Sequence, residues 1–268
     1  MNINVGGNQV KYEVEGPESA PAVMLSHALA ANLSQWDPQV ADLARNYRVV
    51  RYDILGHGGT DAPAGPYTLD LLAEQAAGLL KALGIDRVHF LGLSLGGMIG
   101  QVLAIQAPQC LASLLLCDTT SRILPETRPL WDERIKIALQ EGMEPLVEPT
   151  ITRWFTPGFR KSQTGVVEKV RGMIRKTPPS GYAGCCQAIA PLDLTARLHG
   201  VRLETLIVVG EEDPGTPVAM SREIHGQIHG SELVIIPAAS HMSNLERPDA
   251  FNRAVTSFLT RVAPVPRS

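Results

Sequence analysis

Short runs of apolar residues alternate along the chain with longer stretches in which apolar residues recur at helical spacing. The short runs, typical of buried strands, cover residues 22–27, 47–53, 88–92, 114–117, 205–209 and 233–236. The stretches between them predict helices over residues 39–44, 69–83, 95–106, 218–228 and 248–262. Because continuously apolar strands need cover on both faces, the pattern predicts an α/β fold with a mostly parallel central sheet and helices on both faces. Residues 3–15 alternate around a Gly-Gly turn and predict an antiparallel hairpin at one edge.

Residues 122–187 break this alternation. They contain no run typical of a buried strand, and proline repeatedly interrupts their helical periodicity. We therefore expect a helical insertion, called the cap below, between two parts of a core at residues 1–121 and 188–268. The cap holds 11 Lys and Arg against 7 Asp and Glu, whereas the rest of the chain holds 13 against 20. A basic lid over an acidic body favours anionic substrates, although an uneven spread of surface charge explains the numbers equally well.

The segment Gly92-Leu93-Ser94-Leu95-Gly96 lies between a predicted strand and a predicted helix. Gly-x-Ser-x-Gly at such a junction is typical of a nucleophile elbow, in which the serine occupies a strained turn and glycines let neighbouring backbone pass close by. The helix that follows directs unpaired N–H groups and the positive end of its dipole toward a developing oxyanion. The alternative is a serine that only caps the helix. The context favours Ser94 as a nucleophile.

A serine hydroxyl needs a base, and in this architecture the base follows the nucleophile and an acid in the chain. Of seven histidines, His241 lies in the loop directly after the last predicted strand, at the sheet edge where sites form in α/β proteins. His89 lies inside a strand and is expected to pack there, and His57 is expected to make local hydrogen bonds in a turn. The remaining three histidines of the C-terminal half, His199, His225 and His229, are expected to be solvated.

Three adjacent carboxylates, Glu211, Glu212 and Asp213, follow the predicted strand at 205–209 and compete for the role of the acid. Asp213 is preferred because the proline after it favours an extended conformation and its short side chain suits rigid orientation of an imidazole; Glu212 is the alternative. An Asx turn alone would also explain Asp213. For the oxyanion hole we assign the backbone N–H of Leu95, after the nucleophile, and that of Leu29, in the loop after the first buried strand.

Composition narrows the range of functions. The net charge of -3 argues against a nucleic-acid partner, and no apolar run reaches the length of about 18 residues that a membrane span needs. No leader-like segment opens the sequence, and the four cysteines show neither metal-ligand spacing nor a disulfide pattern. We therefore expect a cytoplasmic enzyme that uses no metal and no cofactor. The oligomeric state is left open.

With these residues placed, the chain resembles the α/β-hydrolase superfamily over essentially its whole length and, within it, the 3-oxoadipate enol-lactonases. The finer resemblance lies in strings such as residues 32–40, 51–58 and 65–68, in residues 153–156 and 181–189 of the cap, and in residues 239–246 around the predicted base. Positions 27–28, 55 and 95 differ from what that family often carries. The resemblance places Ser94, Asp213 and His241 at the nucleophile, acid and base positions and implies an α/β-hydrolase fold with a helical cap.

The resemblance implies hydrolysis of a small ester or lactone, with 3-oxoadipate enol-lactone as the expected substrate and 3-oxoadipate of the β-ketoadipate route as its product. In the cap, Trp131 and Trp154 are candidates for pocket walls and Arg153 for pairing with a substrate carboxylate, although each could instead serve packing or the surface. Three other functions stay open: a general carboxylesterase or another lactonase, a cofactor-free perhydrolase, and a ligand receptor on a hydrolase fold.

Overall fold

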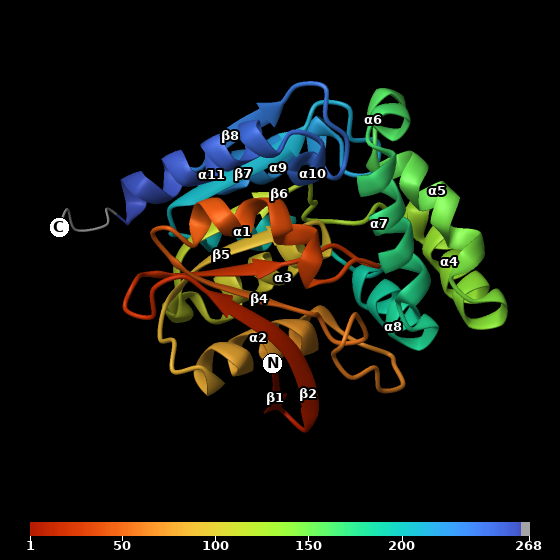
Figure 1. The fold of residues 1–268 in the computed structure, drawn as a ribbon, viewed down its shortest axis with the longest axis horizontal. Coiled ribbons are helices and arrows are strands. Elements are labelled where there is room, and N and C mark those ends of the chain that lie inside the picture. The colour runs from red at the N-terminus through yellow and green to blue at the C-terminus, as the bar shows by residue number, and fades with distance from the viewer. Residues whose placement is uncertain (264–268) are drawn as a thin grey trace.

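An eight-stranded sheet forms the centre of the computed structural model, which describes residues 1–263 (Figure 1). The strands are β1 (Asn2–Val5), β2 (Asn8–Glu15), β3 (Ala22–Ser26), β4 (Arg48–Tyr52), β5 (Val88–Leu93), β6 (Leu111–Cys117), β7 (Thr205–Gly210) and β8 (Glu232–Ile236). Their order is β1-β2-β4-β3-β5-β6-β7-β8. Strands β3 to β8 pair in parallel, and β1 and β2 form an antiparallel hairpin at the edge. The predicted mostly parallel sheet with an edge hairpin is confirmed.

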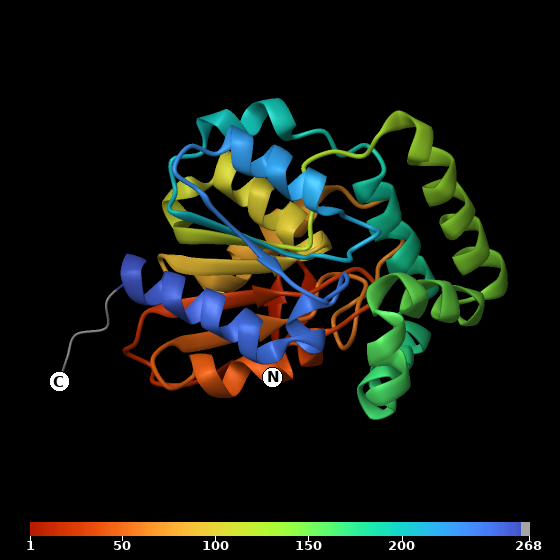
Figure 2. The same ribbon diagram turned by 90° about the horizontal axis from the view of Figure 1, so that it is seen from above.

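Helices cover both faces of the sheet (Figure 2). On one face lie α1 (Asp37–Leu43) and α11 (Pro248–Val262), and on the other α2 (Leu69–Ala82), α3 (Leu95–Gln106) and α9 (Val218–Gln227). Successive strand residues alternate between the two apolar layers: Leu25 belongs to the first layer and Met24 to the second. A strand between two helical layers therefore needs a continuous apolar run, because successive side chains point to opposite faces of the sheet and each face packs against its own apolar layer.

The helices begin and end within two residues of the predicted bounds. The largest shift among the strands is in β6, which starts three residues before the predicted run. The reason is Ser113, whose polar side chain breaks the apolar pattern. It lies fully buried inside β6, where its hydroxyl forms a 2.8 Å hydrogen bond with Nδ1 of His89 on β5. A buried hydroxyl with a partner in the next strand is compatible with a central position.

Between β6 and β7 the chain forms α4 (Arg128–Glu141), α5 (Glu144–Trp154), α6 (Pro157–Ser162), α7 (Thr164–Lys176) and α8 (Pro179–Ile189). These helices lie together at the end of the sheet toward which the arrowheads of the parallel strands point (Figures 1 and 2). Ion pairs join α5 to α7, between Arg171 and Glu148 and between Arg175 and Glu144. The carboxyl ends of the strands thus face the cap. Over the described residues 1–263, no helix is both long and apolar enough to cross a bilayer.

Candidate active site

Ser94 occupies the sharp turn between β5 and α3. Its backbone has φ of 57° and ψ of -113°, a conformation that non-glycine residues rarely adopt. The Ser94 N–H donates to the carbonyl of Cys117 at the end of β6, and Thr119 donates its hydroxyl to the Ser94 carbonyl at 2.8 Å. These bonds from the neighbouring strand end hold the strained turn.

The glycines on either side of Ser94 are needed for close approach of backbone. A Cβ at Gly92 would lie 2.2 Å from the carbonyl oxygen of Gly96, and a Cβ at Gly96 would lie 2.1 Å from the carbonyl oxygen of Ser26. Any side chain at these positions would push β3, β5 and α3 apart. The predicted reason for both glycines is therefore found in the structure.

The loops after β7 and β8 bring Asp213 and His241 together. Nδ1 of His241 lies 2.8 Å from Oδ2 of Asp213, and both residues are buried. The Asp213 carboxylate accepts three further hydrogen bonds. Its Oδ1 accepts the N–H groups of Gly215 and Thr216, and its Oδ2 also accepts the Thr216 hydroxyl at 2.6 Å. Of the three adjacent carboxylates, the structure brings Asp213 to the imidazole, while Glu211 and Glu212 are exposed.

Both pKa values in this pair shift in the direction that favours an ion pair. Burial acts to lower the pKa of His241, but the charge and the hydrogen bond of Asp213 outweigh it, so the pKa lies above its ordinary value. Burial acts to raise the pKa of Asp213, but His241 and the hydrogen bonds from Thr216 lower it overall. Asp213 therefore stays ionised at neutral pH and stabilises the imidazolium that forms when His241 takes up a proton.

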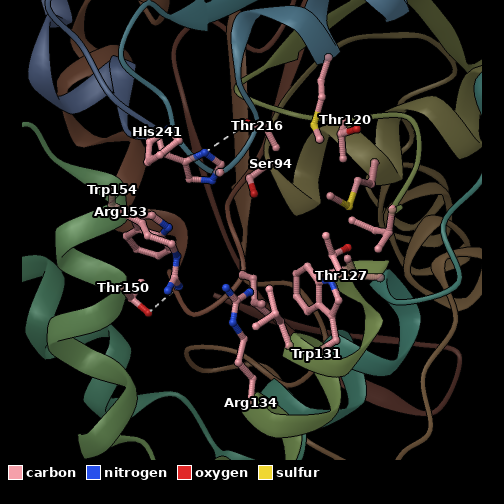
Figure 3. Close-up of a pocket in the computed structure, with 18 of the residues that line it drawn as sticks. Ser94, Thr120, Thr127, Trp131, Arg134, Thr150, Arg153, Trp154, Thr216 and His241 are labelled. Atoms are coloured by element: carbon pink, nitrogen blue, oxygen red, sulfur yellow. Dashed lines mark hydrogen bonds between the residues drawn. The ribbon is translucent and has the colours of Figure 1, made fainter. Parts of the chain in front are cut away.

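Ser94 and His241 line one cavity, and Figure 3 shows the serine side chain beside the imidazole. Among the described residues no hydrogen bond joins the two side chains. Such bonds are often long in the absence of substrate and shorten in the complex. The arrangement is that of a hydroxyl, a base and an acid in sequence, with the base held by the acid.

In the loop after β3, the backbone N–H groups of Ala28 and Ala30 donate to side chains, whereas, within residues 1–263, the N–H between them does not. The Ala28 N–H donates to Oε1 of Gln35 at 3.0 Å, and the Ala30 N–H donates to Nε2 of His57 at 2.9 Å. Between them the Leu29 N–H, like that of Leu95, donates to no acceptor in the part of the chain that the structure describes. Leu29 lines the cavity beside Ser94. Both residues assigned to the oxyanion hole thus have N–H groups free for a ligand.

Two buried histidines support this loop. Nε2 of His27 accepts the Ile54 N–H at 3.0 Å, as Nε2 of His57 accepts that of Ala30. A backbone N–H can only donate, so both rings are neutral and carry their proton on Nδ1. Burial lowers the pKa of His27 to about 4. The pKa of His57 is lowered to about 3, first by burial and then by the charge that His27 carries when it is protonated. The local hydrogen bonds expected for His57 are present.

The cavity has a volume of about 390 Å³ and lies between the ends of the strands and the cap. Its apolar walls come from both parts of the chain and include Leu29, Met98, Ile123, Leu124, Trp131, Trp154, Ile189 and Met220. Trp154 is buried, and its ring stacks on that of His241 with centroids 6.2 Å apart. Both tryptophans proposed as pocket walls therefore lie in the cavity wall.

Three arginines of residues 122–187 line this cavity. Arg122 is paired with Glu223, and the other two, Arg134 and Arg153, are shown in Figure 3. Arg153 of α5 donates to the Thr150 hydroxyl at 3.2 Å, and the Arg134 guanidinium of α4 lies 4.8 Å from the centre of the Trp131 ring. Neither has a carboxylate partner within the described residues, unlike Arg171 and Arg175 in the same cap. Burial, and then the charge of Arg134, lowers the pKa of Arg153 to about 10, which still leaves it charged at neutral pH.

Arg134 was not predicted because α4 carries charges over most of its surface, and its spacing does not show which of them faces the cavity. A second unpredicted residue is Asp118, directly after β6. It is fully buried with a φ of 43°; Oδ1 accepts the Gly210 N–H at 2.8 Å and Oδ2 accepts the Ser243 hydroxyl. It thus contacts both the loop of Asp213 and the segment after His241. Burial, and then the charge of Asp213, raises the pKa of Asp118 to about 8.

Residues 1–263 contain no cluster of three or more His, Cys, Asp or Glu side chains arranged to hold a metal ion. A hydroxyl on a strained turn, a buried imidazole with an ionised acid behind it, and two free N–H groups are the parts that acyl transfer uses.

Comparison with known proteins identifies the family of the chain. Residues 21–248 match the model of the family described as alpha/beta hydrolase fold. The 3-oxoadipate enol-lactonase 2 of Acinetobacter baylyi is 35% identical over 94% of this chain and 93% of its own length. The crystal structure of the enol-lactonase from Burkholderia xenovorans LB400 superposes with a TM-score of 0.94 at 38% identity, covering 97% of this chain and 100% of that one. A putative carbamate hydrolase RutD of Pantoea ananatis is 29% identical over 95% of this chain and 94% of its own length.

Proposed function

The chain belongs to the alpha/beta hydrolase fold family, and we propose that it cleaves a carboxylic ester or lactone through an acyl-enzyme on Ser94. The observation that carries the proposal is the buried His241–Asp213 pair in the wall of the cavity that also contains Ser94 on its strained turn. His241 is the base, and Asp213 holds it in the correct tautomer.

The reaction takes two steps. His241 removes the proton of Ser94 through Nε2 as the hydroxyl oxygen attacks the carbonyl carbon, and the resulting imidazolium is stabilised by Asp213. As the tetrahedral intermediate collapses, the imidazolium of His241 gives this proton to the leaving ester oxygen and becomes neutral again. In an enol-lactone the leaving group is then an enol, which tautomerises to the ketone. Water activated by His241 then attacks the acyl-enzyme and restores Ser94. No cofactor takes part.

The N–H groups of Leu29 and Leu95 are assigned to the oxyanion. In the loop after β3 the adjacent N–H groups already have acceptors, since Ala28 donates to Gln35 and Ala30 to His57, so the Leu29 N–H is the one left for the oxyanion. Loss of one such donor typically costs about 3 kcal/mol of barrier. His57 and Gln35 are therefore positioning residues for Leu29, and they act only through the backbone.

For the substrate we assign a small lactone or ester that carries a free carboxylate, with 3-oxoadipate enol-lactone as the first candidate. Two half-buried arginines without carboxylate partners line a cavity whose walls are mostly apolar, and such a guanidinium is best compensated by a bidentate carboxylate. Arg153 and Arg134 are the residues for this contact. The names of the Acinetobacter baylyi and Burkholderia xenovorans relatives support the same substrate class.

The test is a substrate panel on the intact protein and on Ser94→Ala. The panel holds 3-oxoadipate enol-lactone, the same lactone with its carboxylate converted to a carboxamide, a neutral p-nitrophenyl ester and a carbamate. We expect the carboxylated lactone to be cleaved with the highest kcat/KM, and Ser94→Ala to lose turnover on every member. Undiminished turnover by Ser94→Ala removes the mechanism. If the carbamate is cleaved with the highest kcat/KM, the substrate is assigned instead to the carbamates, the class in the name of the Pantoea ananatis relative.

A further inference from the structure

The loop that carries His241 is hydrogen-bonded to the cap on both sides of the imidazole. Ser240 donates its hydroxyl to the Arg153 carbonyl at 2.9 Å, and Met242 donates its N–H to the Trp154 carbonyl at 3.1 Å. Each chain neighbour of the base thus contacts the backbone of a residue at the end of α5, Arg153 or Trp154, that lines the cavity.

These carbonyls belong to the last turn of α5, where helix geometry leaves C=O groups without intrahelical partners. For Arg153 the helical donor would be residue 157, which is a proline and has no N–H. The Ser240 hydroxyl fills this gap. The end of α5 is therefore completed by the loop of the base and not by the cap itself.

A buried carboxylate adds a second set of bonds between the same two segments. Glu246 of α10 (Ser243–Glu246) is 4% exposed. Its Oε1 accepts the N–H of Thr156 at 2.8 Å and the hydroxyl of Thr156 at 2.9 Å, and its Oε2 accepts the Ser240 N–H in a short hydrogen bond. One side chain thus joins the residue before the base to the second residue after α5.

We propose that Glu246 is a positioning residue that sets substrate specificity: with Ser240 it fixes the end of α5, which carries Arg153 and Trp154, at one distance from His241. This inference rests on the proposed function, in which Arg153 binds the substrate carboxylate. A substrate is then cleaved well when its carboxylate and its reacting carbonyl match that distance. The end of α5 moves with the base as one unit and does not open as a lid.

The chemistry of the carboxylate makes glutamine a disruptive replacement. The two backbone N–H groups of Thr156 and Ser240 contact different oxygens of Glu246, and both can only donate. A glutamine has one acceptor oxygen and an NH₂ group, so in either orientation one of the two N–H groups loses its partner. Glu246→Gln therefore releases one segment from the other while it keeps the volume of the side chain.

The experiment compares kcat/KM for 3-oxoadipate enol-lactone and for its neutral carboxamide analogue in Glu246→Gln and Ser240→Ala. We expect the ratio of the two values to fall at least tenfold in both variants, because the carboxylated lactone depends on the distance between Arg153 and His241. The rate of labelling of Ser94 by a small neutral fluorophosphonate should change much less. Glu74→Gln is the matched control, since Glu74 is exposed on α2 and the substitution removes the same charge. Its ratio should equal that of the unmodified protein.

Equal losses on both lactones in the two variants, or an unchanged ratio, would overturn the inference and leave Glu246 with a purely structural role. Where Glu246→Gln does not fold, Ser240→Ala decides alone, since it removes a single hydroxyl. A failure of the proposed function gives a different result: the unmodified protein then shows no preference for the carboxylated lactone, and the inference falls with its premise. Preference in the unmodified protein that persists in both variants overturns this inference alone.

Discussion

Replacement of Arg153 by methionine tests the assignment of the cavity arginines most directly. A carboxylate about 4 Å from a guanidinium gains about 4 kcal/mol at the effective dielectric constant of about 20 that suits partly buried pairs. Arg134 enters the same cavity and would retain part of that attraction. We therefore expect Arg153→Met to cost about 2–3 kcal/mol, or about 30- to 150-fold in kcat/KM, on a carboxylated lactone.

The assay is steady-state opening of 3-oxoadipate enol-lactone and of its carboxamide analogue, with kcat and KM measured separately. A carboxylate distant from the reacting carbonyl is bound alike in the ground state and in the transition state, so the loss should fall mainly on KM. The carboxamide should lose less than about threefold, a bound that corresponds to about 0.6 kcal/mol. The matched control is Arg171→Met, which removes the same charge from the cap, but at an arginine paired with Glu148.

Two results would refute the reasoning. Equal losses on the charged and the neutral lactone would show that Arg153 acts through packing of α5 alone. A comparable loss with Arg171→Met would show that the net charge of the cap, and not contact in the cavity, attracts the substrate. In that second case the effect should also fade as ionic strength rises, since charges beyond about 10 Å are screened at 0.1 M salt.

Three further outcomes follow from the geometry of the site. Asp213→Asn should lower kcat by about 10³- to 10⁴-fold with an unchanged circular dichroism spectrum, because the amide cannot hold the Nδ1–H tautomer of His241; a loss below tenfold would show that another group orients the base. Because His241 must be neutral to act and its pKa lies above its ordinary value of 6.5, kcat/KM should fall on the acid side with a midpoint above that value, and a midpoint below it contradicts the ion pair. Asp118→Asn should gain thermal stability relative to the unmodified protein as pH rises from about 4 to about 8. The reason is that the pKa of Asp118 is raised in the folded state to about 8, so its neutral form stabilises the fold at low pH and that contribution is lost as pH rises; a Tm difference that stays constant by calorimetry would refute this.

Features that depend on neighbours in the chain could be predicted from the sequence. The apolar runs place each strand because a strand is short and buried on both faces, and Gly92 and Gly96 mark the elbow because the contact they permit is made within a few residues and across the adjacent strand. The juxtaposition of Asp213 and His241 was also predictable, since both follow strands of a parallel sheet, and the carboxyl ends of such strands meet at one edge. Topology alone brings these residues close.

The direction of a side chain on a surface helix could not be predicted in the same way. In α4 the charged residues are spread around the helix, so their spacing does not show that Arg134 lines the cavity whereas Glu133 beside it does not. Arg153 was singled out as a member of a string in the cap that resembles a known family. The resemblance therefore predicts one of the two cavity arginines, Arg153, and the spacing of residues alone predicts neither.

The buried carboxylates Asp118 and Glu246 were missed for a different reason. Each accepts a hydrogen bond from a backbone N–H far away in the chain, Gly210 for Asp118 and Thr156 for Glu246, and a backbone donor leaves no trace in the residue types. A partial signal did exist at Pro157, because a proline has no N–H and so cannot be the helical donor to the Arg153 carbonyl. Since buried carbonyls are nearly always paired, such a proline requires a donor from elsewhere in the fold. In this chain that donor is the hydroxyl of Ser240, next to the base. Because Pro157 leaves the Arg153 carbonyl without a helical donor, this carbonyl bonds to the loop of His241 and so connects the cap to the candidate active site.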